Sequence, residues 1–99
     1  MTTPLEKVFH IIRAISKKNG YTTHEPSSYM SGIYEVFPIT VYSQDKSITF
    51  TVRIGARNGI AQFSSEIPCG IGKTIYPPIY PRKLQEVMYY VAEQIQLIH

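Results

Sequence analysis

Residues 47–54 alternate strictly between polar and apolar side chains. A strand with this period places one face on a core and leaves the other face in water. The apolar set is Ile48, Phe50, Val52 and Ile54, and the polar set is Ser47, Thr49, Thr51 and Arg53. We therefore expect a sheet that the rest of the chain covers on one face only.

Two neighbouring segments are expected to pair with this strand. Tyr34–Tyr42 is rich in β-branched and aromatic residues, and its Pro38 predicts a sheet edge or a bulge because proline cannot donate to the ladder. The polar stretch 43–46 predicts a turn between the first two strands. Asn58-Gly59 predicts a hairpin turn into a third strand at Ile60–Ser65.

Two amphipathic helices are predicted at the ends of the chain. Thr3, Pro4 and Glu6 form a capping box with a favourable proline, and Asn19-Gly20 supplies a stop, so the first helix should span 4–18. The last helix should span 81–98. Its predicted apolar stripe consists of Leu84, Val87, Met88, Val91, Ile95 and Ile98.

The connections 20–33 and 66–81 are long and rich in Gly, Ser or Pro, and they are predicted to be irregular. The expected architecture is a single α+β domain over residues 1–99, a two-layer fold of element order α-β-β-β-α. A three-stranded antiparallel meander would carry both helices on one face, because that arrangement buries all three apolar surfaces together.

The net charge of +3 lies within residues 1–20, where four basic side chains stand against Glu6. This basic first helix could attract an acidic partner, or it could be an ordinary solvated face. A single cysteine excludes an internal disulfide and favours a reducing compartment. With no signal peptide and no apolar run long enough to span a membrane, the sequence predicts a cytoplasmic protein without membrane contact.

Two short motifs resemble known ligand-binding patterns. Gly70-Ile71-Gly72-Lys73-Thr74 ends like a phosphate-binding loop, but Ile67 stands where that loop needs glycine and prolines follow where it needs a helix. Pro77-Pro78-Ile79-Tyr80 matches a pattern read by WW domains. We favour structural roles for both, a flexible glycine loop and an extended lead-in to the last helix.

No set of residues predicts catalysis. His10, His24, His99 and Cys69 show no metal-ligand spacing, and the carboxylates are scattered singly. A nucleophile–base pair of Cys69 and His24 is conceivable, since both lie in long connections, but nothing in the sequence brings them together. We therefore expect no enzyme, no cofactor and no metal site.

The expected element order resembles that of double-stranded-RNA-binding domains, with Arg82 and Lys83 at the start of the last helix. The resemblance covers the element order alone. Leu84-Gln85-Glu86 replaces the family's lysine run, and the turn 43–46 lacks its Gly-Pro-x-His signature. A nucleic-acid-binding domain is therefore the alternative hypothesis, with contacts from Lys7, Arg13, Lys17, Lys18, Arg82 and Lys83.

The leading hypothesis is a small binding module that acts through protein–protein interaction, as adaptors and inhibitors do, including those carried by phages and plasmids. Tyr and Arg are enriched at interface hot spots, and binding residues concentrate on loops and open faces. The predicted partner-binding residues are Tyr29, Met30, Arg53, Arg57, Lys73, Tyr76 and Tyr80. A homodimer formed through the open sheet face is a third possibility.

Overall fold

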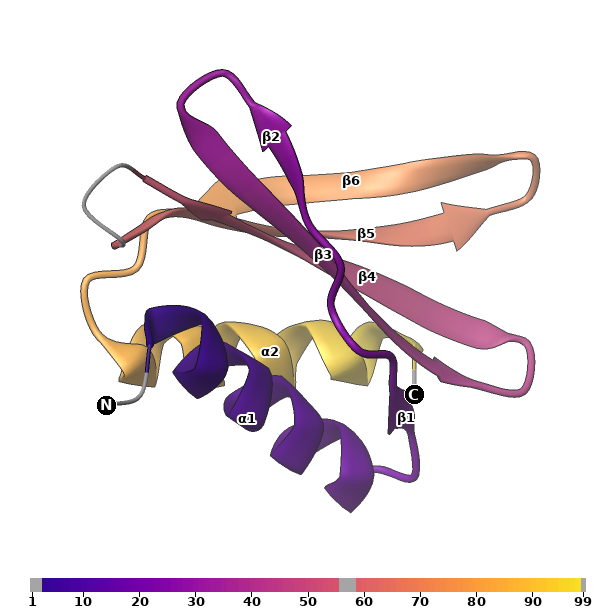
Figure 1. Ribbon diagram of the computed structural model, residues 1–99. Helices are drawn as coiled ribbons and strands as arrows, with labels where there is room; N and C mark the ends of the chain where they lie inside the picture. The colour runs from indigo at the N-terminus through magenta and orange to yellow at the C-terminus, as the bar shows by residue number, and fades with distance from the viewer. Residues whose placement is uncertain (1–2, 56–58, 99) are drawn as a thin grey trace.

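In the computed structural model, which describes residues 3–55 and 59–98, one helix precedes six strands in the chain and a second helix follows them (Figure 1). The elements are α1 (Pro4–Lys18), β1 (Thr22–Thr23), β2 (Tyr29–Ser31), β3 (Tyr34–Ser43), β4 (Lys46–Ile54), β5 (Ile60–Cys69), β6 (Gly72–Ile79) and α2 (Leu84–Ile98). The α+β class and the terminal helices agree with the sequence prediction. Neither helix in the described ranges is long and apolar enough to cross a bilayer.

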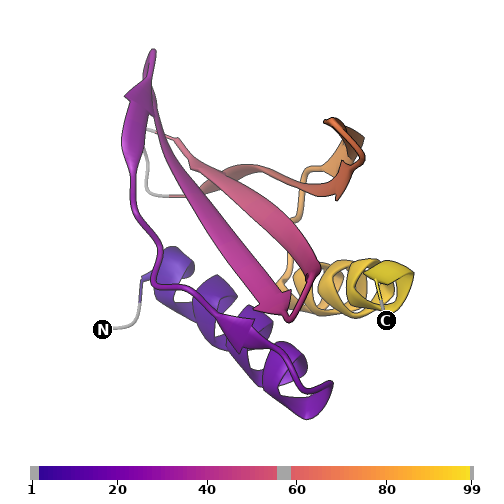
Figure 2. The same ribbon diagram turned by 90° about the vertical axis from the view of Figure 1, so that its right-hand side faces the viewer.

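All strand pairs are antiparallel, and the sheet order is β1-β3-β4-β5-β6, with β2 also paired to β3. Both helices lie on one side of the strongly twisted sheet, as Figures 1 and 2 show. The apolar residues predicted for β4 all face the helices and are buried, with Phe50 stacked on Phe63 of β5. Strand β4 is therefore the middle of the core.

The first helix has the predicted bounds because its end signals are local. Thr3 Oγ1 accepts a hydrogen bond from the Glu6 backbone N–H at 3.2 Å, and Pro4 occupies the first turn. At the other end Gly20 adopts a φ of 83°, in the left-handed region that favours glycine. Val8, Ile12 and Ser16 form the fully buried stripe of this helix.

The prediction of a three-stranded meander is too coarse, because both long connections contain strands. Residues 20–33 include β1 and β2, which pair with opposite halves of the outer edge of β3. Pro38 lies between those two pairings, so the proline predicted to mark an edge marks the gap between two short edge strands.

The prediction that residues 66–81 are irregular is also wrong, because they complete a hairpin. Strand β5 continues to Cys69, beyond the predicted end at Ser65, and β6 returns from Gly72 to Ile79. Pro77 and Pro78 are tolerated because β6 lies at the edge of the sheet, where a missing N–H donor breaks no ladder with an outer strand. The six strands also remove the likeness in element order to double-stranded-RNA-binding domains.

The last helix begins at Leu84, three residues later than predicted. Glu86 accepts a hydrogen bond from the backbone N–H of Arg82 at 2.6 Å, which caps the start of the helix. Its buried stripe also differs from the prediction: Leu84 and Met88 are exposed, whereas Tyr90 and Gln94 are buried.

Strands β4 and β5 pair antiparallel, and beyond the end of β4 the Gly55 N–H donates to the Gly59 carbonyl at 2.9 Å. The predicted hairpin is therefore present, although Asn58 lies outside the described residues.

Three other hairpins turn through two residues, and the first of each pair has a positive φ. These residues are Gly32, Gln44 and Gly70, with φ of 64°, 55° and 60°. Turns of this kind match the twist of the flanking strands. Gln44 is the one position of the three where a side chain opposes that conformation.

We predict that Gln44→Gly stabilises the fold by about 1 kcal/mol, because glycine adopts a positive φ without a clash. Asp45→Gly is the matched control, since Asp45 has no positive φ and gains nothing from glycine. Urea unfolding followed by circular dichroism measures both. If both substitutions changed the free energy of unfolding equally, Gln44 would not be strained.

Candidate functional site

The sheet face opposite the helices is uncovered by any other element of the described chain (Figure 2). Residues paired across strands share a face, so the register identifies its members. One row runs from β2 to β5 as Tyr29, Val36, Arg53 and Gln62. The structure therefore brings together two predicted partner-binding residues, Tyr29 and Arg53, that are 24 positions apart in the chain.

Val36 has no exposed surface, yet it lies outside the core cluster that the helices cover. Its neighbours in the row are Tyr29 on one side and Arg53 on the other. Side chains on the uncovered face therefore bury Val36 among themselves. This packing places an aromatic ring and a guanidinium beside the same buried valine.

Arg53 is partly buried, and it has no hydrogen-bond or ion-pair partner within residues 3–55 and 59–98. A guanidinium presents five donors in a fixed planar fork that fits a carboxylate. On the same face, Lys73 is already paired with Glu66 at 2.9 Å between Nζ and Oε2. Arg53 is therefore an available cation on this face, where the other charges placed by strand register, Lys73 and Glu66, form that pair.

The rest of this face carries hydroxyl groups. Thr40 and Thr49 lie opposite each other, and their Oγ1 atoms are 3.0 Å apart. Ser47, Thr51 and Ser64 lie on the same side by register. This surface offers donors and acceptors along β4, beginning with Thr51 two residues from Arg53, without adding charge.

The other predicted partner-binding residues are dispersed. Met30 is exposed on the opposite side of the sheet from Tyr29, since neighbours in a strand point to opposite faces. Tyr76 is half-buried opposite Ser65, on the side of the helices. Tyr80 follows β6 and is 67% exposed. Arg57 lies outside the described residues.

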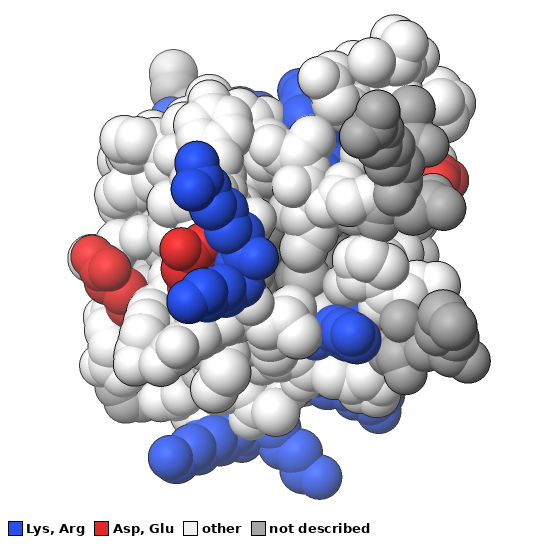
Figure 3. All heavy atoms as spheres, turned by 90° about the vertical axis from the view of Figure 1, so that its left-hand side faces the viewer, with Lys and Arg blue, Asp and Glu red and all other residues white. Residues whose placement is uncertain are grey.

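The residues of the nucleic-acid alternative divide between the two helices. Lys7, Arg13, Lys17 and Lys18 are all exposed on α1, and none has an ion-pair partner in the described part of the chain. Arg82 and Lys83 are exposed just before α2. Figure 3 shows the basic side chains of one end of the molecule in separate groups, with acidic side chains beside one of them.

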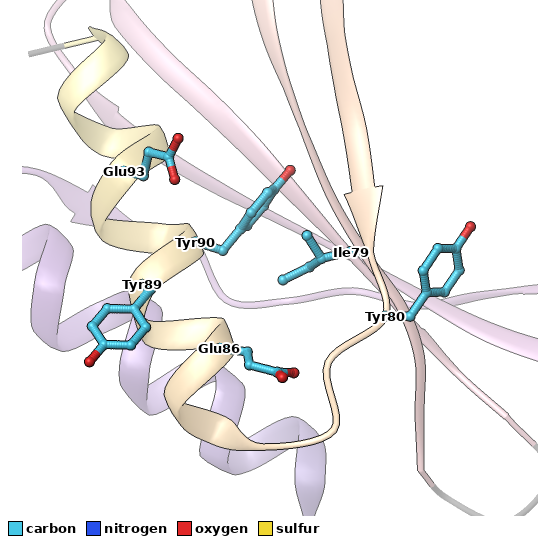
Figure 4. A pocket seen from close by; sticks show the side chains of 6 residues that line it. All are labelled: Ile79, Tyr80, Glu86, Tyr89, Tyr90 and Glu93. Atoms are coloured by element: carbon cyan, nitrogen blue, oxygen red, sulfur yellow. The ribbon is translucent and has the colours of Figure 1, made fainter.

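A shallow groove of about 530 Å³ lies between α2 and the end of β6. It is lined by Ile79, Tyr80, Glu86, Tyr89, Tyr90 and Glu93. Figure 4 shows Ile79 and Tyr90 pointing toward each other, whereas Tyr80 points away from the helix. Glu86 accepts hydrogen bonds from the backbone at the start of the helix. Glu93 is therefore the carboxylate of the groove that has no such capping role.

A buried polar network beside this groove was missed by the sequence prediction. Ser65 donates from Oγ to Gln94 Oε1 at 2.7 Å. Its hydroxyl has one hydrogen, so the Tyr90 hydroxyl, 3.0 Å away, donates to Ser65. Burial raises the pKa of Tyr90, hydrogen bonding to Ser65 opposes the rise, and the charge of Glu93 adds to it. Polar residues at the core positions of a strand and a helix were the available signal.

The residues weighed for catalysis do not come together. His24 follows β1 and stacks on Tyr42, with 4.5 Å between ring centroids, whereas Cys69 is exposed at the turn into β6. These strands lie at opposite edges of the sheet, so a Cys69–His24 pair does not form. Within the described ranges, no three His, Cys, Asp or Glu side chains gather as a group that could hold a metal ion.

The two short motifs also acquire defined places. Gly70-Ile71 forms a hairpin turn, and Gly72–Thr74 begins β6 instead of a helix. The prolines of Pro77-Pro78-Ile79-Tyr80 are exposed, but Ile79 packs against the core. The glycine motif thus lacks the helix N-terminus on which a phosphate-binding loop depends.

No protein-family model matches this chain, and neither a curated protein nor a solved structure matches it. The residues of the chain itself therefore carry every functional inference.

We predict that Ser65→Ala destabilises the protein by about 2 kcal/mol, because Gln94 and Tyr90 both lose a buried partner. Tyr90→Phe should cost about 1 kcal/mol, since Ser65 and Gln94 keep their hydrogen bond. Ser64→Ala, on the uncovered face, is the control and should change stability by less than about 0.5 kcal/mol. Chemical denaturation measures all three. A Ser65→Ala cost no larger than that of Ser64→Ala would mean that the network adds nothing.

Proposed function

We propose that this chain is a non-enzymatic binding module that docks a protein partner on the uncovered sheet face, as an adaptor or inhibitor would. The observation that carries the proposal is the row of Tyr29, Val36 and Arg53, in which the guanidinium has no acceptor among the described residues. A sheet that is covered on one face only has the other face free for a partner.

The chemistry of the face indicates the chemistry of the partner. Arg53 fits a carboxylate, and the Tyr29 ring, 55% exposed, offers apolar contact area beside it. The surrounding hydroxyl groups suit hydrogen bonds at a polar rim. The partner surface should therefore present an aspartate or glutamate next to an apolar side chain.

A second candidate function is nucleic-acid binding by the helical side. It is supported by the four exposed basic side chains of α1, which have no ion-pair partner among the described residues and could follow a phosphate backbone by electrostatic attraction. The separation of these residues from Arg82 and Lys83 weakens it. The two functions use opposite sides of the protein, so substitutions distinguish them.

We predict that Arg53→Ala reduces recovery of a specific protein partner at least about tenfold, because an unpaired carboxylate would then be buried in the interface. Tyr29→Ala should weaken recovery through lost apolar contact. The measurement is quantitative mass spectrometry after affinity purification from the native lysate, with wild type and variants processed in parallel.

Arg13→Ala is the matched control, since it removes the same side chain from the exposed face of α1. Circular dichroism of each variant checks that the fold is kept. A partner lost with Arg13→Ala and retained with Arg53→Ala would place binding on the helices, and the sheet-face proposal would be wrong.

For the second candidate, we predict that binding to a short duplex RNA or DNA weakens steeply with salt. Lys17→Ala and Lys18→Ala should each lower the slope of log affinity against log salt by about 1, if each lysine contacts a phosphate. Fluorescence anisotropy measures the slope, with Arg53→Ala on the uncovered sheet face as the control. No binding at low ionic strength would exclude this function.

A further inference from the structure

The two edges of the sheet differ in how they are covered. The outer edge of β3 pairs with β1 and β2, whereas β6 pairs only with β5 among the described strands. An unpaired edge presents a row of backbone donors and acceptors to any other extended chain. In Figure 1 the β5–β6 turn extends past the ends of both helices, so the helices do not cover the start of β6.

The part of β6 that can accept another strand is sharply bounded. It begins after the Gly70-Ile71 turn and ends before Pro77, where donors are lost and the pairing with β5 becomes irregular. The five residues between these limits are Gly72, Lys73, Thr74, Ile75 and Tyr76. Ile75, next to the central Thr74, is 67% exposed.

We propose that the free edge of β6 pairs with the same edge of a second copy, antiparallel and centred on Thr74. A two-fold axis at Thr74 uses all five residues and no others. Thr74 then lies opposite Thr74 of the second copy, Lys73 opposite its Ile75, and Gly72 opposite its Tyr76.

The two residues of each pair are compatible with each other. Threonine pairs are favourable across antiparallel strands, and the aliphatic stem of Lys73 can cover isoleucine while its charge keeps its pair with Glu66 of its own chain. Like charges do not meet, because the sole charged residue of the segment faces an apolar one. A second copy meets the limits of this segment by symmetry and brings no like charges together, and it is the occupant that we propose.

The first test changes the charge opposite Lys73. Ile75→Lys places two lysines opposite each other at both symmetric positions, and it should raise the dimer dissociation constant about tenfold. Ile75→Glu creates two opposite-charge pairs and should lower that constant about tenfold. Sedimentation equilibrium of wild type and both variants measures the constants.

Within one copy the two substitutions are expected to act on stability in the opposite direction. An effect on folding can therefore be told apart from an effect on dimerisation. Ile75 lies opposite Glu66 of its own chain, so lysine is the favourable residue there and glutamate the unfavourable one. A wild type that stays monomeric up to about 1 mM, the range of weak association, would overturn the proposal. So would equal dissociation constants for the two variants.

The second test fixes the register. In a Cys69→Ser background, Thr74→Cys places the two sulfur atoms across the axis, at a strand separation that permits a disulfide. Its dimeric disulfide should form at least about tenfold faster than that of Asp45→Cys, an exposed turn position that reports random collision. Equal rates would exclude the register centred on Thr74.

Discussion

The alternation along β4 is the constraint on which the rest of the structure depends. Its inward side chains are buried, and each fully buried apolar side chain contributes roughly 1.5–3 kcal/mol. Both helices must bury their apolar stripes, and this side of the sheet is the apolar surface that receives them. The helices therefore share one face, and the polar residues of β4, Arg53 among them, are left on the other.

The polar network in the core sets how α2 is rotated. Ser65 lies on the helix-facing side of β5, where an unpaired hydroxyl would be costly. Tyr90 and Gln94 turn inward to meet it, and the Phe63 ring packs edge-on against Tyr90 at 5.3 Å between centroids. Because the side of the helix that carries Tyr90 and Gln94 faces the sheet, Leu84 and Met88 are exposed.

Signals confined to a few neighbouring residues predicted the structure well. The capping box at Thr3 fixed the first helix to the residue, and the alternation at 47–54 identified the buried face of β4. The missed strands β1, β2 and β6 are edge strands. Strands β1 and β2 are only two and three residues long, and β6 contains Pro77 and Pro78, so none of them shows the alternation that marks β4. Tyr29 and Arg53 could be chosen separately as residue types. Their shared row depends on the β2–β3–β4 register, which the two-residue turns at 32–33 and 44–45 set, and the first of these turns was not predicted.

The uncovered face and the free edge are compatible with each other. In an antiparallel pairing through β6, the sheet continues from one copy into the next, and both sets of helices lie on the same side. The two Arg53 faces would then also lie on one side, at a fixed separation. Such a dimer would present two docking sites to a partner that carries repeated acidic segments, and linked binding of this kind raises the effective affinity without any new contact. Self-pairing at the edge would therefore strengthen the function proposed for the face while leaving each single site unchanged.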